Sequence, residues 1–450
     1  MSSPAVDALV ERCRSLSAVD LPAPVARATR HSLLDGFGLA LAGAQTELAS
    51  LLRRTVGGRS GECTILGSGD RVAAADAALL NGAAIHALDF DDLHPVARAH
   101  LTATVLPAVL ALAEQRGDPQ QSVLAAYVAG VEVAAAVGSW VNPAHYDRGW
   151  HATGTVGTIG AAAACAHLLG LEADEWTTAL ALAATQAAGV RGTFGSMAKP
   201  LHAGRAAASG LLSARLAAEG FTCARGALDG PTGFLGIHGD LDQLGASGRN
   251  GREWAVDAIL FKFHTACYMT HAGILNARAL VAEHGVEPAE IDSIEVHVAP
   301  ELEGVCDIAE PQEPLEGKFS LQLTTALGIV GADTADEDAF SREALSDATV
   351  RDLCRRVTVT FSPELDGQPT RARTQLMTRS GALLAAEHDT GEPERDLDAR
   401  EEKLVAKFRS LARKVLDADA VAALEEEILR CPSGSIAPAL RLAAAVRQPG

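Results

Sequence analysis

The stretch HALDFDDLHPVARAH, residues 86–100, places three carboxylates and three imidazoles between two apolar runs. These runs cover residues 72–87 and 101–113, and both have the composition of helices. Pro95 stops any helix between them. We therefore predict a helix, a polar connection and a second helix, with His100 at the N-terminal mouth of the second.

The polar connection carries candidate catalytic groups. The macrodipole at a helix N-terminus disfavours imidazolium, so it favours His100 in the neutral form that a general base needs. Residues three or four apart share a helix face, which puts His86 and Asp89 on one side and Asp91 elsewhere. The alternative is a solvated acidic loop with ordinary surface histidines. Clusters of titratable groups also occur outside functional sites, so the cluster alone does not decide between the two.

Two further polar residues precede helices rich in Ala and Gly. His151 comes directly before the run ATGTVGTIGAAAACAHLL, and Lys199 lies in AKPLHAGRAA. Pro200 predicts extended backbone at Lys199, with a helix from residue 203. A lysine beside a helix N-terminus suits an anion, since free N–H groups and the ammonium converge. The alternatives are a buried structural His151 and an ordinary flanking charge at Lys199. The shared layout predicts that these groups and His100 face one pocket.

A third polar segment, FKFHTACYMTHAG, covers residues 261–273. It holds Lys262, Tyr268 and two histidines, His264 and His271, which we interpret as structural. The chain has six lysines among 38 Lys and Arg residues, so each mid-chain lysine stands out, including Lys318. The segment lies where the sequence character changes, and clefts between domains often hold small-molecule sites.

Composition limits the fold and the partners. The 450 residues are 48% hydrophobic but only 4% aromatic, which favours closely packed helices built from small side chains. A net charge of −19 argues against nucleic-acid binding. The eight cysteines show no metal-ligand spacing, and without a signal peptide we expect a reducing cytoplasm. The uncharged run 149–171 is interpreted as a buried helix, so no membrane partner is expected.

The pattern predicts a mainly α protein with an α+β second domain. Helical segments dominate residues 1–265, with a Gly-rich surface loop over 230–240. Alternating strands follow in residues 266–400, at IEVHVAP, RVTVTFSP and TRARTQLMTRSGALLAAE. The acidic run 389–402 is predicted to be a solvated linker. Residues 401–450 are helical again and are expected to pack back on the first domain.

Taken together in this order, several motifs resemble the MmgE/PrpD family over nearly the whole chain. They are LLDGFGLALAG, NGAAIHALDFDDLH, GWHATGTVGTIGAA, AKPLHAGRAA, GFTCARGALDGPTGFL, FKFHTACYMTHAGILNA and EGKFSLQL. The resemblance implies a large helical bundle with a smaller α+β lid, a homodimer, and no metal or organic cofactor. It implies catalytic positions at Asp89, His100, His151, Lys199 and Lys262. We also predict substrate contacts at Leu93, His202, Arg205, Tyr268 and Leu323.

Two positions depart from the family pattern. Leu93 and Leu323 stand where many members have threonine and tyrosine, so two hydroxyls are lost. A site that lacks such groups favours a less hydroxylated or more apolar substrate, and Tyr268 is a candidate replacement for one of the hydroxyls.

The function expected from the resemblance is a lyase for a small di- or tricarboxylic acid. Lysines would hold carboxylates, His100 and His151 would act as base and acid, and Asp89 would set a neighbour's tautomer or position. Dehydration of the 2-methylcitrate type is the leading prediction. The alternatives are decarboxylation of an acid like cis-aconitate, epimerisation of an imino or hydroxy diacid, and a non-catalytic relative. A further one is a metallohydrolase using His86, Asp89, Asp92 and His100.

Overall fold

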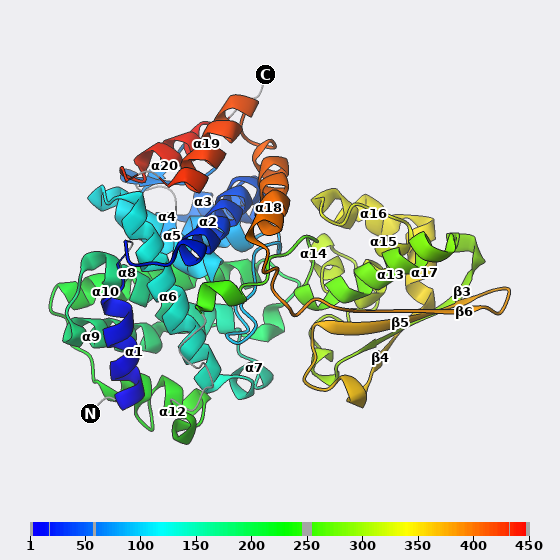
Figure 1. Cartoon of the computed structure of the whole chain (residues 1–450), viewed down its shortest axis with the longest axis horizontal. Helices are drawn as coiled ribbons and strands as arrows, with labels where there is room; N and C mark the ends of the chain where they lie inside the picture. Colours follow the sequence, from blue (N-terminus) through cyan, green and yellow to red (C-terminus); the bar gives the residue numbers. More distant parts are fainter. Residues whose placement is uncertain (1–2, 18, 57–59, 245–253, 432, 447–450) are drawn as a thin grey trace.

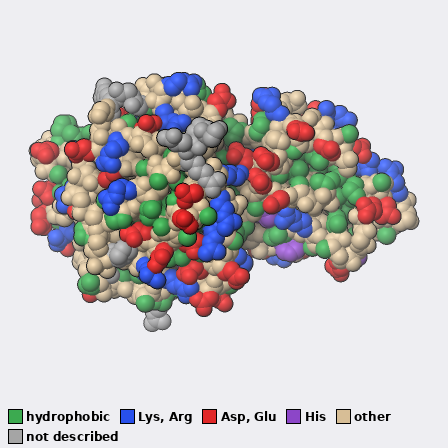
Figure 2. Space-filling view, turned by 90° about the horizontal axis from the view of Figure 1, so that it is seen from above, with side chains coloured by type: hydrophobic (Ala, Val, Ile, Leu, Met, Phe, Trp, Pro, Cys, Tyr) green, Lys and Arg blue, Asp and Glu red, His purple; other side chains and the backbone are tan. Residues whose placement is uncertain are grey.

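The computed structural model describes residues 3–17, 19–56, 60–244, 254–431 and 433–446. A large helical lobe and a smaller lobe with a sheet lie side by side (Figure 1). This confirms the predicted fold class, a helical domain with an α+β domain. Figure 2 shows the two lobes meeting at a narrow waist, with acidic and basic side chains interspersed over this face.

The large lobe contains residues from both ends of the chain. Its N-terminal helices are α1 Pro4–Arg14, α2 Ala23–Gly43, α3 Glu47–Val56, α4 Ala74–His86, α5 Thr102–Arg116, α6 Gln120–Val141, α7 Ala144–Asp147, α8 Ala152–Leu169, α9 Ala173–Gln186, α10 Ala198–Ala218, α11 Gly226–Asp229 and α12 Phe234–His238. A small hairpin joins β1 Ser60–Thr64 to β2 Arg71–Val72. The C-terminal helices are α18 Leu397–Ala412, α19 Ala418–Arg430 and α20 Ala437–Ala444.

Glycines set the close packing of the central helices. A Cβ on Gly204 of α10 would lie 2.2 Å from the carbonyl oxygen of Leu79 in α4, so no larger residue fits there. Gly130 of α6 and Gly160 of α8 meet in the same way, each facing the other's carbonyl oxygen. Backbones that approach this closely bring the ends of α4, α8 and α10 together, and these ends carry the candidate site.

The most apolar helices are core elements. α6 and α8 are long and apolar enough to cross a membrane, but 83% and 89% of the most apolar 18-residue segment of each helix is buried inside the protein. This confirms the buried helix expected over residues 149–171. The same core takes in Leu404 and Phe408 of α18, which packs along α2.

The smaller lobe, which we call the lid, has its own hydrophobic core. Its strands are β3 Ile291–Val298, β4 Val357–Phe361, β5 Arg371–Thr378 and β6 Leu383–Asp389, and its helices are α13 His271–His284, α14 Pro314–Gly317, α15 Leu321–Ile329, α16 Arg342–Ser346 and α17 Ala348–Arg356. The sheet order is β4-β3-β5-β6, with β3 parallel to β4 and the other pairs antiparallel. Burial alternates along β5, as the period-2 pattern predicted.

Three local predictions were wrong. α10 begins at Ala198, so Lys199 is helical and not extended; Pro200 is tolerated because N–H groups in the first turn have no partner within the helix. The Gly-rich segment 230–240 contains α12 and buries Phe234 and Leu235. The acidic run 389–402 is only partly a linker, since α18 begins at Leu397, capped by Asp396.

Candidate active site

The connection between α4 and α5 forms the floor of the site. Asp89 adopts a left-handed conformation with φ 51°, which reverses the chain after α4 ends. Leu93 then pairs with Leu260 through two backbone hydrogen bonds of 2.8 and 2.9 Å. The segment is buried, so the solvated acidic loop considered above is excluded.

Lysines from three distant segments fix this connection. Each ammonium donates to one of three successive carbonyls: Lys318 to Leu88 at 2.7 Å, Lys262 to Asp89 at 2.8 Å and Lys407 to Phe90 at 2.7 Å. Lys407 also pairs with Asp35 at 2.7 Å. Burial lowers the pKa of Lys318 to about 8. The lid and the C-terminal helix α18 therefore both hold the backbone that carries the site.

Asp89 is the centre of a buried ion cluster. Its Oδ1 accepts from Lys199 at 2.6 Å and from Lys262 at 2.9 Å. Burial alone would raise the pKa of Asp89, but the two ammonium groups outweigh burial and hold the pKa below its usual range. Asp89 Oδ2 has no hydrogen-bond partner. Two positive charges around one negative charge leave the cluster positive, which suits an anionic ligand.

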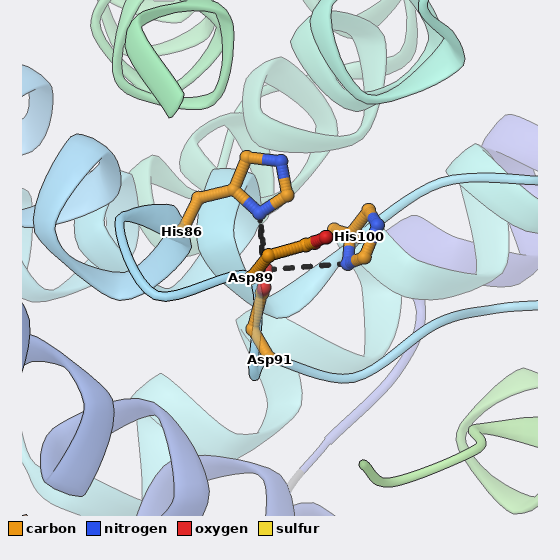
Figure 3. A group of neighbouring side chains, drawn as sticks. All are labelled: His86, Asp89, Asp91 and His100. Carbon is orange, nitrogen blue, oxygen red and sulfur yellow. Dashed lines mark hydrogen bonds and ion pairs between the residues drawn. The ribbon is translucent and has the colours of Figure 1, made fainter. Parts of the chain in front are cut away.

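Asp91 holds two imidazoles and lies between them (Figure 3). His86 Nδ1 donates to its carboxylate at 2.9 Å, and His100 Nδ1 lies 3.4 Å from Oδ2. Burial would raise the pKa of Asp91, but the imidazoles hold it well below its usual range. Burial also lowers the pKa of His100 and takes that of His86 to about 3, so both rings are neutral near pH 7.

This arrangement corrects one prediction. Asp91, and not Asp89, is the partner of His86, because α4 ends at His86 and helical spacing no longer applies beyond it. The carboxylate of Asp91 faces Nδ1 of both rings, whereas Asp89 holds two lysines, and its predicted role in positioning a neighbour stays a prediction.

His151 precedes α8 as expected and lies near the other imidazoles. Its ring is 5.9 Å from that of His86, and its Nδ1 is 3.1 Å from Nδ1 of His202 on α10. Burial and the nearby Lys199 charge put the pKa of His151 well below its usual range. His151 Nε2 is buried without a hydrogen-bond partner. A buried nitrogen without a partner is a position where a ligand or water would bind.

These groups open on a cavity of about 100 Å³ between the large lobe and the lid. All five predicted catalytic residues line it: Asp89, His100, His151, Lys199 and Lys262. Its apolar wall includes Leu93, Phe194, Met269, Leu302, Val305 and Phe319. The structure thus brings together groups up to 173 positions apart in the chain.

The predicted substrate contacts separate into two groups. Leu93 and Tyr268 line the cavity, and His202 touches His151 behind it. Tyr268 donates its hydroxyl to the Thr390 carbonyl at 2.6 Å, so this donor does not replace a lost hydroxyl. Arg205 is exposed on α10, and Leu323 is buried in the lid core beside another pocket. The last two do not line this cavity, and their assignment to the substrate stays a prediction.

The sequence did not predict Phe194 as part of the site, nor the pairing of His86 with Asp91; His86 was predicted only as a candidate metal ligand. Phe194 lies in a short connection and meets the His151 ring edge-on at 5.1 Å, where no motif marks it. His86 and Asp91 are five positions apart, which is not a spacing that shares a helix face. Their contact follows only once it is known that α4 ends at His86. The scarcity of lysine did single out Lys318.

Four side chains have the donor set of a cation site. His86, Asp89, Asp91 and His100 place ligand atoms within 4.8 Å of one another. This set contains Asp91 where the predicted set had Asp92. The carboxylate of Asp92 instead accepts hydrogen bonds from the hydroxyl and the backbone N–H of Thr102. Asp89 already binds two ammonium groups and Asp91 faces two rings, so a metal ion would compete with these partners.

Comparison with known proteins agrees with the geometry. The family model described as the MmgE/PrpD N-terminal domain matches residues 7–245, and the MmgE/PrpD C-terminal domain matches residues 264–431. The chain belongs to the MmgE/PrpD family. This MmgE/PrpD protein is 28% identical to the cis-aconitate decarboxylase-like protein oryM of Aspergillus oryzae, with 95% of each chain covered.

Other MmgE/PrpD relatives are similarly distant. Identity is 26% to cis-aconitate decarboxylase of Aspergillus terreus, covering 92% of this chain and 90% of the relative. It is 28% to cis-aconitate decarboxylase of Homo sapiens, covering 89% and 86%. A lyase-type function is therefore supported for this member of the family.

Proposed function

We propose that this protein is a lyase that moves a proton at a carbon next to a carboxylate of a small polycarboxylic acid, with loss of carbon dioxide. The observation that carries this proposal is a buried cavity with two ammonium groups and two neutral imidazoles on its walls. No cofactor is needed for the reaction, because these side chains supply both charge stabilisation and proton transfer.

Lys199 and Lys262 bind one substrate carboxylate beside Asp89. As the bond to the leaving group weakens, negative charge spreads onto this carboxylate, and fixed ammonium groups stabilise it without reorganising. Both lysines are already held by Asp89 Oδ1, so their positions are set before substrate arrives. This preorganisation is the main source of rate acceleration in the proposal.

His100 and His151 carry the proton. Asp91 faces Nδ1 of His100, which leaves Nε2 for the substrate side. His202 touches Nδ1 of His151, and the free atom is again Nε2. Both pKa values are lowered in the free protein, but a bound polyanion adds negative charge beside the rings and favours their protonated forms. The substrate thus turns neutral imidazoles into acids.

Two observations favour decarboxylation over dehydration and epimerisation: the apolar wall of the cavity, and the similarity of the chain to cis-aconitate decarboxylases. A carboxylate placed against Leu93, Met269 and Phe319 loses its hydrating water and is destabilised. Carbon dioxide is neutral and is not destabilised by the same loss of water, so this wall favours release of carbon dioxide. Dehydration is the second candidate, because two imidazoles with separate free nitrogens provide both a base for C–H and an acid for a leaving hydroxyl.

Proton NMR in D₂O distinguishes these reactions. The protein is incubated with a panel of unsaturated and hydroxylated di- and tricarboxylic acids that includes cis-aconitate. For each acid, the spectra show whether a product forms and whether deuterium is incorporated at the product carbon. Carbon dioxide release with one deuterium incorporated supports decarboxylation, and loss of water without carbon dioxide supports dehydration. A panel that shows neither product nor exchange contradicts the proposed function.

We further propose a homodimer in the cytoplasm. The eight cysteines are free thiols, which suits a reducing compartment. Light scattering of the purified protein tests the dimer, and a particle with the 46.6 kDa mass of one chain contradicts it.

A further inference from the structure

The lid contributes a carboxylate to the cavity wall. Glu301 lies in the 3-10 helix Pro300–Leu302 and lines the cavity that holds Asp89 and the two lysines. Its Oε2 is buried and has no hydrogen-bond partner. Within the described ranges Glu301 also forms no ion pair. A negative group of this kind repels an anion and attracts a hydrogen-bond donor or a neutral group.

The fixed positive charge of the cavity, before any imidazole is protonated, suffices for little more than one carboxylate. Lys199 and Lys262 share Asp89, which leaves a single net positive charge at the floor. The remaining cation of the lining, Arg98, is paired with Asp147 at 3.3 Å. The rest of the wall is largely apolar. A tricarboxylate would therefore place one carboxylate against Glu301 or against hydrocarbon, with no further fixed cation to compensate its charge.

We infer that the substrate is an unsaturated dicarboxylate with an alkyl group where cis-aconitate has its third carboxylate. This inference rests on the proposed function and names its substrate class. One carboxylate is bound by the lysine pair, the other departs from the apolar side, and the alkyl group packs on the wall that includes Leu93. Glu301 is then a specificity residue that excludes tricarboxylates.

The reaction is balanced for a substrate such as (E)-3-methylglutaconate. The bond between its CH₂ carbon and the departing carboxylate breaks, and the electron pair forms a new double bond to the middle carbon. The original double bond supplies electrons to the carbon beside the retained carboxylate, which takes one proton from an imidazole. The products are carbon dioxide and 3-methylbut-3-enoate, and the imidazole regains its proton from water.

The test compares cis-aconitate with (E)-3-methylglutaconate, which has a methyl group in place of the carboxylate on the middle carbon and the same geometry about the double bond. Carbon dioxide release is measured for the full chain with both acids. We expect kcat/KM at least tenfold higher for 3-methylglutaconate. A preference for cis-aconitate overturns the inference and leaves the proposed function intact, whereas no turnover of either acid, or of any acid in the wider panel, overturns both.

Substitution of Glu301 tests its role directly. Glu301→Gln keeps the size of the side chain and removes its charge, so the ratio of kcat/KM for cis-aconitate to kcat/KM for 3-methylglutaconate should rise at least tenfold. Glu303→Gln is the matched control, since Glu303 is exposed on the same turn. An unchanged preference in Glu301→Gln, in protein that melts like the wild type, contradicts the assignment.

Discussion

Replacing Lys199 by Met tests the ion cluster around Asp89. Lys199 Nζ donates to Asp89 Oδ1 at 2.6 Å and lies 5.4 and 5.1 Å from the Phe194 and Phe319 rings. Met occupies nearly the same volume among these rings but carries no charge. Asp89 keeps Lys262 at 2.9 Å, so its carboxylate is not left without a cation. The substitution therefore removes a charge at the substrate and preserves the packing.

The expected loss of activity is larger than the loss of stability. Removing one preorganised group that stabilises developing charge typically costs about 10²–10³ in kcat, or about 3–4 kcal/mol. Removing one of two hydrogen bonds to a buried carboxylate costs about 1–3 kcal/mol of unfolding free energy. We expect Lys199→Met to be folded, to melt a few degrees lower, and to lose at least two orders of magnitude in carbon dioxide release.

The assay pairs substrate turnover with urea unfolding of the same preparations. Lys403→Met is the matched control, because Lys403 is an exposed lysine of α18 whose ion pair with Glu394 is 3.1 Å long. This control should keep both activity and stability. Turnover by folded Lys199→Met within threefold of the wild type would refute the role of the cluster in catalysis.

Four other outcomes are expected. Asp91→Asn removes the carboxylate that orients two imidazoles, so kcat should fall about 10²–10⁴-fold with a shifted pH profile; an unchanged profile contradicts this. Burial raises the pKa of Asp92 from 3.8 to about 7, so its stabilising contribution is complete below pH 3.8 and is lost as pH rises through 7. Urea unfolding of Asp92→Asn should accordingly show a smaller loss of stability between pH 5 and pH 8 than the wild type, and an equal loss refutes this. Lys318→Met leaves the Leu88 carbonyl unpaired, which should cost about 1–3 kcal/mol of unfolding free energy, and an unchanged denaturation midpoint argues against it. Dialysis against EDTA should leave turnover unchanged, whereas a loss restored by one divalent metal would favour a metal site at His86 and its neighbours.

Much of the fold was predictable because its signals are local. Period-2 alternation identified the strands of the lid, and apolar runs with Gly and Pro punctuation identified the helices of the large lobe. The main errors occurred where local rules compete. Pro200 disfavours helix at the residue before it, yet the first turn of α10 accommodates both Lys199 and the proline.

Local rules predicted the site best where a residue sits at a helix start, whereas the family resemblance pointed to Asp89 and Lys262. His100, His151 and Lys199 precede or begin α5, α8 and α10, and their convergence on one cavity matches that layout. The pairing of His86 with Asp91 was not predictable, since it depends on the left-handed turn at Asp89. Glu301 was not predictable either, because a single glutamate in a loop carries no sequence signal, and its place in the site depends on how the lid packs on the large lobe.

The three ammonium groups that hold Leu88, Asp89 and Phe90 have a consequence for synthesis of the protein. Their donors lie 230, 173 and 317 positions further along the chain. While a ribosome is still adding residues, the helices of the large lobe can form from what has already emerged, but the backbone below the cavity lacks its anchors. The last anchor, Lys407, emerges after every residue that lines the cavity. An unfinished chain therefore contains the catalytic side chains without the arrangement that makes them an enzyme.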